Sequence, residues 1–145
     1  MGDADWFREA QVRGQLWVAV DEADAGTPVA FALFEELDGG LHLEEVDVHP
    51  DHARQGLGAR LIDAAAAWAR ELGYRAITLT TFRYVAWNAP YYERLGFRAL
   101  PAEAWGPALR DRVADETRRG LVPERRVVMQ RPIGAAREPG EEEER

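Results

Sequence analysis

Two glycines at a predicted strand-to-helix junction mark the segment of this chain best suited to bind an anion. Residues 41–48 are predicted to form a strand, and a long amphipathic helix is predicted from residue 57. Glycine lets the backbone approach a ligand closely, and successive N–H groups at a helix start point toward negative charge. We therefore expect a diphosphate to bind at a turn formed by Arg54, Gln55, Gly56, Leu57, Gly58, Ala59 and Arg60.

The spacing of the glycines excludes two common phosphate-binding loops. No Lys-Ser or Lys-Thr pair follows Gly58, as a Walker loop requires, and the third glycine of a dinucleotide fingerprint is missing. The turn therefore suits a diphosphate carried by a different molecule. Taken alone, the same Gly-x-Gly spacing is also compatible with a tight turn that binds nothing.

A second motif follows a strand that is predicted at residues 76–82. Asn88 is a good helix cap, Pro90 suits a first helical turn, and Gly96 is expected to end the short helix. Tyr92 lies inside this helix, four residues before Gly96. The helix therefore offers an amide and a phenol as candidate functional groups.

Together the two motifs resemble the GCN5-related N-acetyltransferase (GNAT) superfamily, whose acetyl-CoA motif is Gln/Arg-x-x-Gly-x-Gly/Ala. The resemblance is direct over residues 41–97 and extends more loosely over residues 16–133. It implies an α/β fold with a mixed, mostly antiparallel sheet flanked by helices. One position departs, because the family's Gln or Arg falls on Ala53 here. The phosphate site is built from backbone, so we expect this change at most to weaken binding.

The resemblance also implies roles for residues outside the glycine turn. The backbone of Val46, Asp47 and Val48 would pair with the pantetheine arm of acetyl-CoA, and the same region could supply an N–H to the thioester oxygen. Tyr92 matches the family position that protonates the departing thiolate, and an ordinary phenol pKa near 10 suits that role. Asn88 has two compatible roles, capping its helix and bonding the pantetheine arm.

Deprotonating an acceptor ammonium requires a base, and the predicted strand offers three candidates. Glu45 is the first, because the family often carries an acid facing the acceptor at this point of the strand. Glu44 and His42 are the alternatives. A strict period of two would place Glu44 and Glu45 on opposite faces, but a bulge, which is common in the family here, would change that assignment.

The composition indicates one globular domain that works without thiol chemistry. The chain has 145 residues, a hydrophobic fraction of 46% and no cysteine, so acetyl transfer should be direct, within a ternary complex. A formal net charge of -8 argues against nucleic acid as a partner. We expect a single domain over residues 1–136 and a disordered acidic tail over residues 137–145.

Membrane and metal sites are not expected. No apolar run approaches the roughly 20 residues of a membrane span and no signal peptide opens the chain, which favours a cytoplasmic protein. A metal reading of His49, Asp51 and His52 is disfavoured, because Pro50 and the turn after it prevent these side chains from converging. An open sheet edge would allow a homodimer.

The remaining elements are predicted from periodicity and turn residues. We expect a short helix over residues 3–15, strands at 16–20, 29–34 and 126–131, and a helical or irregular stretch at 107–119. The helix over residues 57–72 should bury a stripe formed by Leu61, Ala65, Trp68 and Leu72. About fifteen residues precede Leu16, so the family's usual first strand and helix, which help to wall the acceptor site, are expected to be missing.

The leading hypothesis is an acetyl-CoA-dependent N-acetyltransferase that modifies a primary amine. The acidic balance favours a cationic acceptor, such as a small amine or a peptide N-terminus. The alternative is a non-catalytic acyl-CoA-binding module, either regulatory or completed by a partner. A third reading is an interaction domain that retains only the fold.

Overall fold

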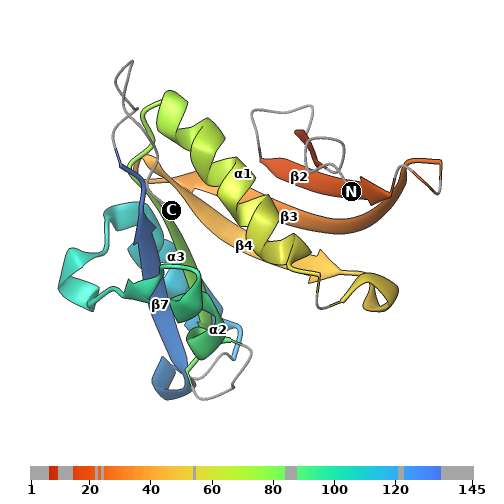
Figure 1. The fold of residues 1–145 in the computed structure, drawn as a ribbon. Coiled ribbons are helices and arrows are strands. Elements are labelled where there is room, and N and C mark those ends of the chain that lie inside the picture. The colour runs from red at the N-terminus through yellow and green to blue at the C-terminus, as the bar shows by residue number, and fades with distance from the viewer. Residues whose placement is uncertain are drawn as a thin grey trace.

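The computed structural model describes residues 7–9, 15–21, 23, 25–53, 55–83, 88–120 and 123–134. They form a seven-stranded sheet with the order β1-β2-β3-β4-β5-β7-β6 (Figure 1). Neighbouring strands are antiparallel except β4 and β5, which run parallel, so the predicted mixed sheet is confirmed. The strands are β1 Phe7–Glu9, β2 Leu16–Asp21, β3 Thr27–Leu37, β4 Gly40–Val48, β5 Ala76–Phe82, β6 Arg98–Ala99 and β7 Arg126–Pro132.

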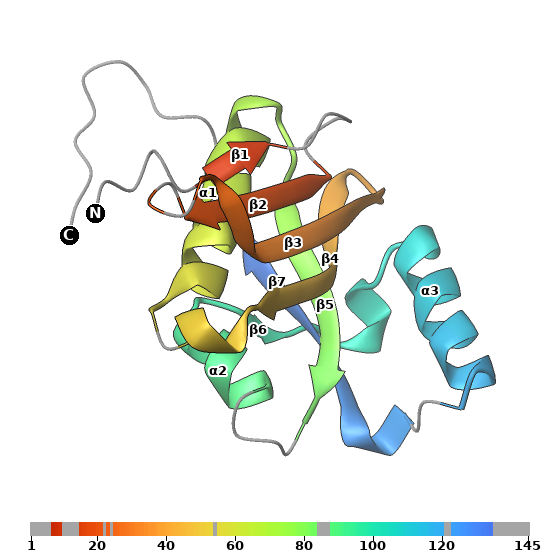
Figure 2. The ribbon, with the colours of Figure 1, turned by 90° about the vertical axis from the view of Figure 1, so that its right-hand side faces the viewer.

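Helices cover both faces of the sheet. Helices α1 (Leu57–Glu71) and α2 (Ala89–Arg94) lie on one face, and α3 (Pro107–Arg118) lies on the other (Figure 2). The described residues include the single-turn 3-10 helices η2 Pro50–His52, η3 Ala102–Ala104 and η4 Pro123–Arg125. No helix within the described ranges is both long enough and apolar enough to cross a lipid bilayer.

Helix α1 packs on the sheet through the predicted apolar stripe, with one exception. Leu61 and Ala65 are fully buried, and burial of a leucine side chain contributes about 2 kcal/mol. Trp68 is partly buried and stacks on the Tyr74 ring at 5.9 Å between centroids. The expectation for Leu72 is wrong, because its side chain is 60% exposed. The helix ends before Leu72, and the left-handed turn at residue 73 then leads the chain away from the helix axis.

The first described segment corrects the prediction for the N-terminal region. Residues 7–9 form β1, which pairs antiparallel with β2 in the register Phe7↔Ala19, whereas a helix was expected over residues 3–15 and no strand was expected ahead of Leu16. The unpaired N–H and C=O groups of an edge strand favour the addition of another strand. Residues 3–6 and 10–14 of that prediction lie outside the described residues.

A β-bulge in β4 sets the direction of the acidic side chains. The register with β3 passes from Leu33↔Glu45 to Phe34↔Leu43, so Glu44 is an extra residue on β4. A bulge of this kind interrupts the alternation of a strand and places the two residues at the bulge on similar sides. The side chains of Glu44 and Glu45 therefore lie on similar sides of β4, whereas a strict period of two would place them on opposite faces of the sheet.

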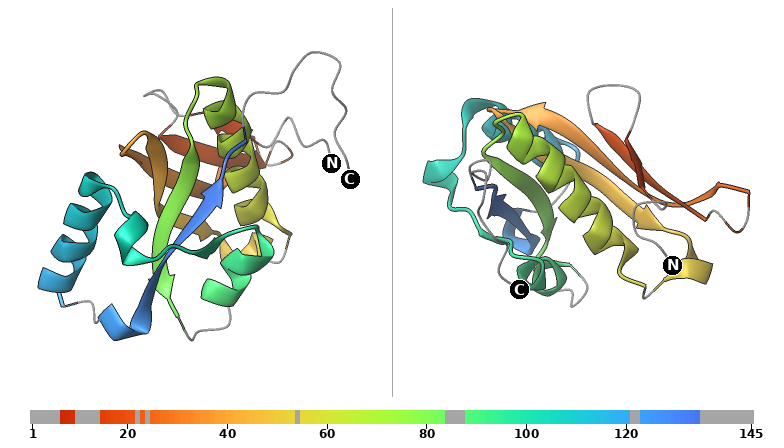
Figure 3. Two further views of the ribbon diagram at one scale, coloured as in Figure 1. Left: turned by 90° about the vertical axis from the view of Figure 1, so that its left-hand side faces the viewer. Right: turned by 45° about the horizontal axis from the view of Figure 1, so that its top comes forward.

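Strands β4 and β5 part soon after they meet. Their parallel pairing consists of Leu41↔Ile77 and His42↔Thr78. Figure 3 shows the two strands diverging beyond this contact. The edge of β4 that faces β5 therefore lacks a partner strand from residue 43 onward, within the part of the chain that the structure describes.

The turn between β3 and β4 also anchors α3. Asp38 and Gly39 both have positive φ angles, 55° and 76°, as the central residues of a type I′ hairpin turn require. The Asp38 carboxylate accepts hydrogen bonds from the backbone N–H groups of Ala108 and Leu109, each at 2.9 Å. A residue distant in sequence therefore supplies the N-terminal cap of α3, and it carries the negative charge that a helix start favours.

Candidate active site

The backbone amides at the start of α1 form the first part of the site. Gly56 precedes the helix in the left-handed conformation (φ 73°), and the first helical hydrogen bond in this turn runs from Arg60 N to Gly56 O at 3.0 Å. The N–H groups of Leu57, Gly58 and Ala59 precede this bond and have no helical acceptor. We call the backbone N–H groups of residues 55–59 the amide cradle. The Arg60 N–H, which was also expected to contribute, is used by the helix itself. Arg54, which was expected to contribute, lies outside the described residues.

Gly58 allows three elements to meet beside the amide cradle. A Cβ atom at this position would lie 3.3 Å from the Tyr91 hydroxyl oxygen and 3.6 Å from Val46 Cγ2. Those two atoms belong to α2 and β4. The missing side chain therefore brings α1, α2 and β4 together at one place, next to the amides of the cradle.

A cleft of about 240 Å³ lies where β4 and β5 part, and we call it the strand cleft. Its wall combines residues from both faces of the sheet, since adjacent residues of β5 point to opposite sides. The predicted site residues that line it are Glu44, Glu45, Val46, Asn88 and Tyr92. The structure thus brings together residues that are nearly fifty positions apart in the sequence.

Three of the candidate residues lie outside the wall of the strand cleft. Val48 packs against the hydrophobic core, and Asp47 is exposed beside His49 on the outer part of β4. His42 is only 2% exposed, and its Nδ1 lies 2.9 Å from Thr78 Oγ1. Burial lowers the pKa of His42 to about 4, so the ring is neutral at pH 7.

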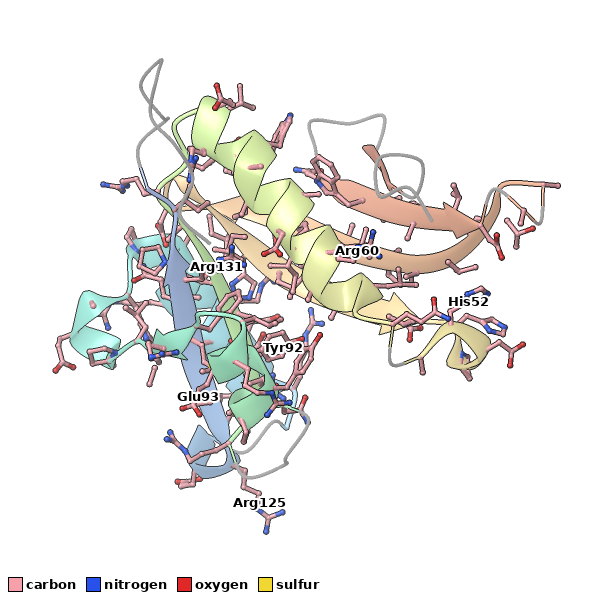
Figure 4. The ribbon with its side chains drawn as sticks, in the orientation of Figure 1. His52, Arg60, Tyr92, Glu93, Arg125 and Arg131 are labelled. Carbon is pink, nitrogen blue, oxygen red and sulfur yellow. The ribbon has the colours of Figure 1, made fainter. Side chains whose placement is uncertain are left out.

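Aromatic packing holds the Tyr92 side chain, which projects from α2 into the wall of the strand cleft. Its ring lies 5.2 Å from the Tyr91 ring and 5.6 Å from the Phe97 ring, both in edge-to-face geometry. Figure 4 shows Tyr92 on α2 and Arg60 on α1. Burial, with a smaller contribution from Tyr91, raises the pKa of Tyr92 to about 12. This is above the ordinary phenol pKa near 10 that was expected from the sequence. The phenol therefore keeps its proton at any pH between 7 and 9.

Asn88 takes a different hydrogen bond from the one predicted. It occupies the position before α2, and Tyr92 N donates to its backbone oxygen at 2.9 Å. Its side chain does not cap the helix, because Oδ1 instead accepts a hydrogen bond from Thr81 Oγ1 at 3.0 Å. Asn88 therefore occupies the predicted N-cap position, but its side chain does not make a capping hydrogen bond. The amide is held instead at the end of β5, where it lines the strand cleft.

The two acidic residues of β4 have different surroundings. Glu44 forms an ion pair with Arg112 of α3, and Arg112 also pairs with Glu35 of β3. Burial, followed by the nearby charge of Glu116, raises the pKa of Glu44. The Glu45 carboxylate has no hydrogen bond or ion pair with any described residue and is exposed. Glu45 is therefore the more accessible carboxylate at the strand cleft.

The histidines after β4 do not gather ligands around a common point. His49 Nδ1 accepts a hydrogen bond from the Asp51 backbone N–H at 3.1 Å, and the His49 and His52 ring centroids are 6.2 Å apart. No group of three or more His, Asp or Glu side chains that could hold a metal ion occurs among the residues described.

Sequence reasoning missed three residues at or beside the strand cleft. Thr80 and Arg126 line it, and Arg112 neutralises Glu44. The alternation along β5 could have identified Thr80, since it follows a core residue by one position. Neither arginine carries a local signal, because each reaches the site through the packing of α3 or the pairing of β7 with β5.

Comparisons with known proteins give a family match and several similar folds. The model of the acetyltransferase (GNAT) family matches residues 2–97. N-acetylglutamate synthase from Neisseria gonorrhoeae, in complex with coenzyme A and N-acetyl-glutamate, has a TM-score of 0.65 and 14% identity over 83% of this chain. This chain spans only 26% of that synthase.

Two further solved structures share the fold. Ribosomal-protein-S18-alanine N-acetyltransferase from Escherichia coli has a TM-score of 0.59 and 19% identity, covering 96% of this chain and 76% of its own. PaiA N-acetyltransferase from Thermoplasma acidophilum, in complex with coenzyme A, has a TM-score of 0.56 and 13% identity, covering 81% and 59%.

Proposed function

The chain belongs to the acetyltransferase (GNAT) family, and from that premise we propose that it transfers an acetyl group from acetyl-CoA to a primary amine. One observation carries the proposal: the amide cradle and Tyr92 lie on the same face of the sheet, beside the strand cleft. A cofactor with a diphosphate at one end and a thioester at the other needs such an arrangement. Two similar solved structures, which contain coenzyme A, support this choice.

The cofactor is bound mainly by backbone groups. The amide cradle holds the diphosphate, and the dipole of α1 adds about 1 kcal/mol to its hydrogen bonds. The pantetheine arm pairs with residues 46–48 of β4 as an added strand, since the edge of β4 facing β5 is open there. The Asn88 side chain, fixed by Thr81, lies along this path.

The reaction is a direct transfer. The neutral amine nitrogen attacks the thioester carbonyl, so a C–N bond forms and the C–S bond breaks. Glu45 takes the proton that the ammonium must lose, because Glu44 is already neutralised by Arg112. Tyr92 donates a hydrogen bond, and then its proton, to the departing sulfur as negative charge develops there. The proton that the nitrogen loses as the amide forms returns to the phenolate, so Tyr92 ends the cycle protonated.

Binding of the diphosphate at the amide cradle predicts a charge effect at Gln55. Gln55→Glu should raise the Kd for acetyl-CoA about tenfold, since the new carboxylate repels the diphosphate at short range. Without cofactor the same variant should be as stable as the native protein or slightly more stable, because an acid near a helix start is favourable. Thermal shift at a fixed acetyl-CoA concentration measures both effects.

Gln55→Lys is the matched control, since it places the opposite charge on the same exposed residue. Its acetyl-CoA shift should equal or exceed the native one, and 0.5 M salt should bring the two variants closer together. Equal thermal shifts for Gln55→Glu and Gln55→Lys at low salt would contradict binding of the diphosphate at this end of α1.

The assignment of Glu45 as the base predicts a change in pH dependence. Glu45→Gln should lower kcat/KM about tenfold at pH 7, because the amine must then lose its proton before it binds. The rate of this variant should rise about tenfold per pH unit from pH 7 to 9, as the fraction of neutral amine grows, whereas the native rate rises less steeply. Parallel pH profiles for Glu45→Gln and the native enzyme would show that a group other than Glu45 deprotonates the acceptor ammonium.

A further inference from the structure

A second cavity, which we call the α3 pocket, lies on the opposite face of the sheet from α1. It has a volume of about 340 Å³, at the lower end of the range of small-molecule sites. Apolar residues of α3, β7 and the segment after β6 form most of its wall: Leu100, Pro101, Trp105, Val113, Val127 and Val128.

The α3 pocket is a fixed structure. The Trp105 ring is held by a hydrogen bond from Nε1 to Leu100 O at 2.9 Å. Helix α3 is anchored at its start by the Asp38 cap and in its middle by the ion pairs of Arg112. A Cβ atom at Gly106 would lie 2.5 Å from Asp38 Cγ, so the chain can enter the helix at this distance only through glycine.

The α3 pocket adjoins the strand cleft. Thr80 and Arg126 line both cavities. The Thr80 hydroxyl oxygen is buried and has no hydrogen-bond partner among the described residues. A buried hydroxyl without a partner costs free energy, so a ligand group that bonds it here gains affinity.

Carboxylates line both cavities. Glu116 lines the α3 pocket, and its carboxylate lies 3.9 Å from the Arg126 guanidinium. Glu44 and Glu45 line the strand cleft, and Glu44 is paired with an arginine of α3. The carboxylate of Glu45, which has no partner among the described residues, therefore favours a single ammonium group in the strand cleft. The apolar wall of the α3 pocket, together with the positive charges of Arg83 and Arg126 at its edge, disfavours a second ammonium group there.

Resting on the proposed function, we infer that the α3 pocket binds a compact apolar substituent of the acceptor. The acceptor is then a small primary amine with one charged end and one apolar end. Its nitrogen lies in the strand cleft, where it hydrogen-bonds to the Thr80 hydroxyl and faces Glu45, and its apolar group enters the α3 pocket. This excludes polyamines, which the acidic composition of the chain would otherwise favour.

The first test compares four primary amines with the full-length chain, measuring release of the coenzyme A thiol from acetyl-CoA. The kcat/KM for 2-phenylethylamine and 3-methylbutylamine should exceed that for ethanolamine and 1,4-diaminobutane at least tenfold, as an apolar pocket distinguishes its ligands. Equal or better use of the diamine would overturn the inference. So would use of a peptide with an N-terminal phenylalanine when neither apolar amine reacts.

The second test fills the α3 pocket and has a matched control on the same helix. Val113→Phe should lower kcat/KM for 2-phenylethylamine about tenfold or more, and Ala102→Leu, on the opposite wall, should act in the same direction. Ala114→Phe places an equally large ring on an exposed position of α3 and should leave kcat/KM unchanged. Equal rates for Val113→Phe and Ala114→Phe would overturn the inference.

The thermal shift with acetyl-CoA distinguishes a failure of the proposed function from a failure of the proposed acceptor specificity. All three variants should keep the native shift, which shows that the fold and the cofactor site are intact. Absence of a shift in the native protein would overturn the proposed function and this inference with it. A native shift without preference for the apolar amines would overturn this inference alone.

Discussion

Tyr92→Phe should lower kcat about 100-fold while leaving the affinity for acetyl-CoA unchanged. The variant keeps the edge-to-face ring contacts with Tyr91 and Phe97 and loses only the hydroxyl. A positioned proton donor contributes typically 10²–10⁴-fold, and this phenol stays protonated because its pKa is raised to about 12. We expect the loss at the lower end of that range, since so weak an acid transfers its proton late. Steady-state kinetics with a saturating amine measure the effect.

Tyr91→Phe is the matched control, because it removes the same atom from the adjacent residue of α2. The Tyr91 hydroxyl approaches Gly58 at the amide cradle, so any effect should fall on acetyl-CoA affinity and leave kcat near the native value. A Tyr92→Phe variant with native kcat would assign thiolate protonation to water. If the native chain bound acetyl-CoA but released no thiol with any amine, a non-catalytic acyl-CoA-binding module would be the better description.

The proposed cofactor half of the site could be predicted because its signals are local. A turn that needs two glycines, followed by a helix, specifies the amide cradle within six residues. The short helix that carries Tyr92 is likewise predicted from the residues that bound it, and the role of Tyr92 is what the resemblance to the GNAT family implies. Backbone geometry and short-range turn chemistry determine both segments, so no knowledge of the packing was needed.

The proposed acceptor half of the site could not be predicted because it depends on contacts between distant segments. The bulge at Glu44 leaves no mark on a run of two glutamates, although it decides which way both side chains point. Arg112 reaches Glu44 only after Asp38 has anchored α3 on the sheet. The pocket that follows from these contacts is visible only when the helix is in place.

Very short strands were missed for a related reason. Strands β1 (Phe7–Glu9) and β6 (Arg98–Ala99) are three and two residues long, too short to show a period of two. Each forms by hydrogen bonding to the edge of a longer strand, β1 to β2 and β6 to β7. The side chain of Asn88 was misjudged for a similar reason. Its Oδ1 accepts a hydrogen bond from Thr81, which lies on β5, and not from the backbone of its own helix.

The buried His42 predicts an acid-sensitive fold. Burial lowers its pKa to about 4 in the folded chain, against about 6.5 when unfolded. Between these values the unfolded state binds a proton that the folded state does not, so the free energy of unfolding falls as the pH drops. The difference of about 2.5 pKa units corresponds to about 3 kcal/mol of stability, which is fully present above pH 7 and is lost as the pH falls from 6.5 to 4.

His42→Gln isolates this effect, because glutamine can still bond Thr78 but does not titrate. Urea unfolding at pH 7.5, 5.5 and 4.5 should show the native protein losing about 3 kcal/mol relative to the variant. The other histidines and Glu44, whose raised pKa acts in the opposite direction, are common to both proteins and cancel. Parallel stability profiles would contradict the burial argument. His42 occupies the last paired position before β4 and β5 part, so we expect its protonation to destabilise the junction from which the strand cleft opens. Acetyl-CoA binding should therefore fail together with the fold in acid and reappear in His42→Gln.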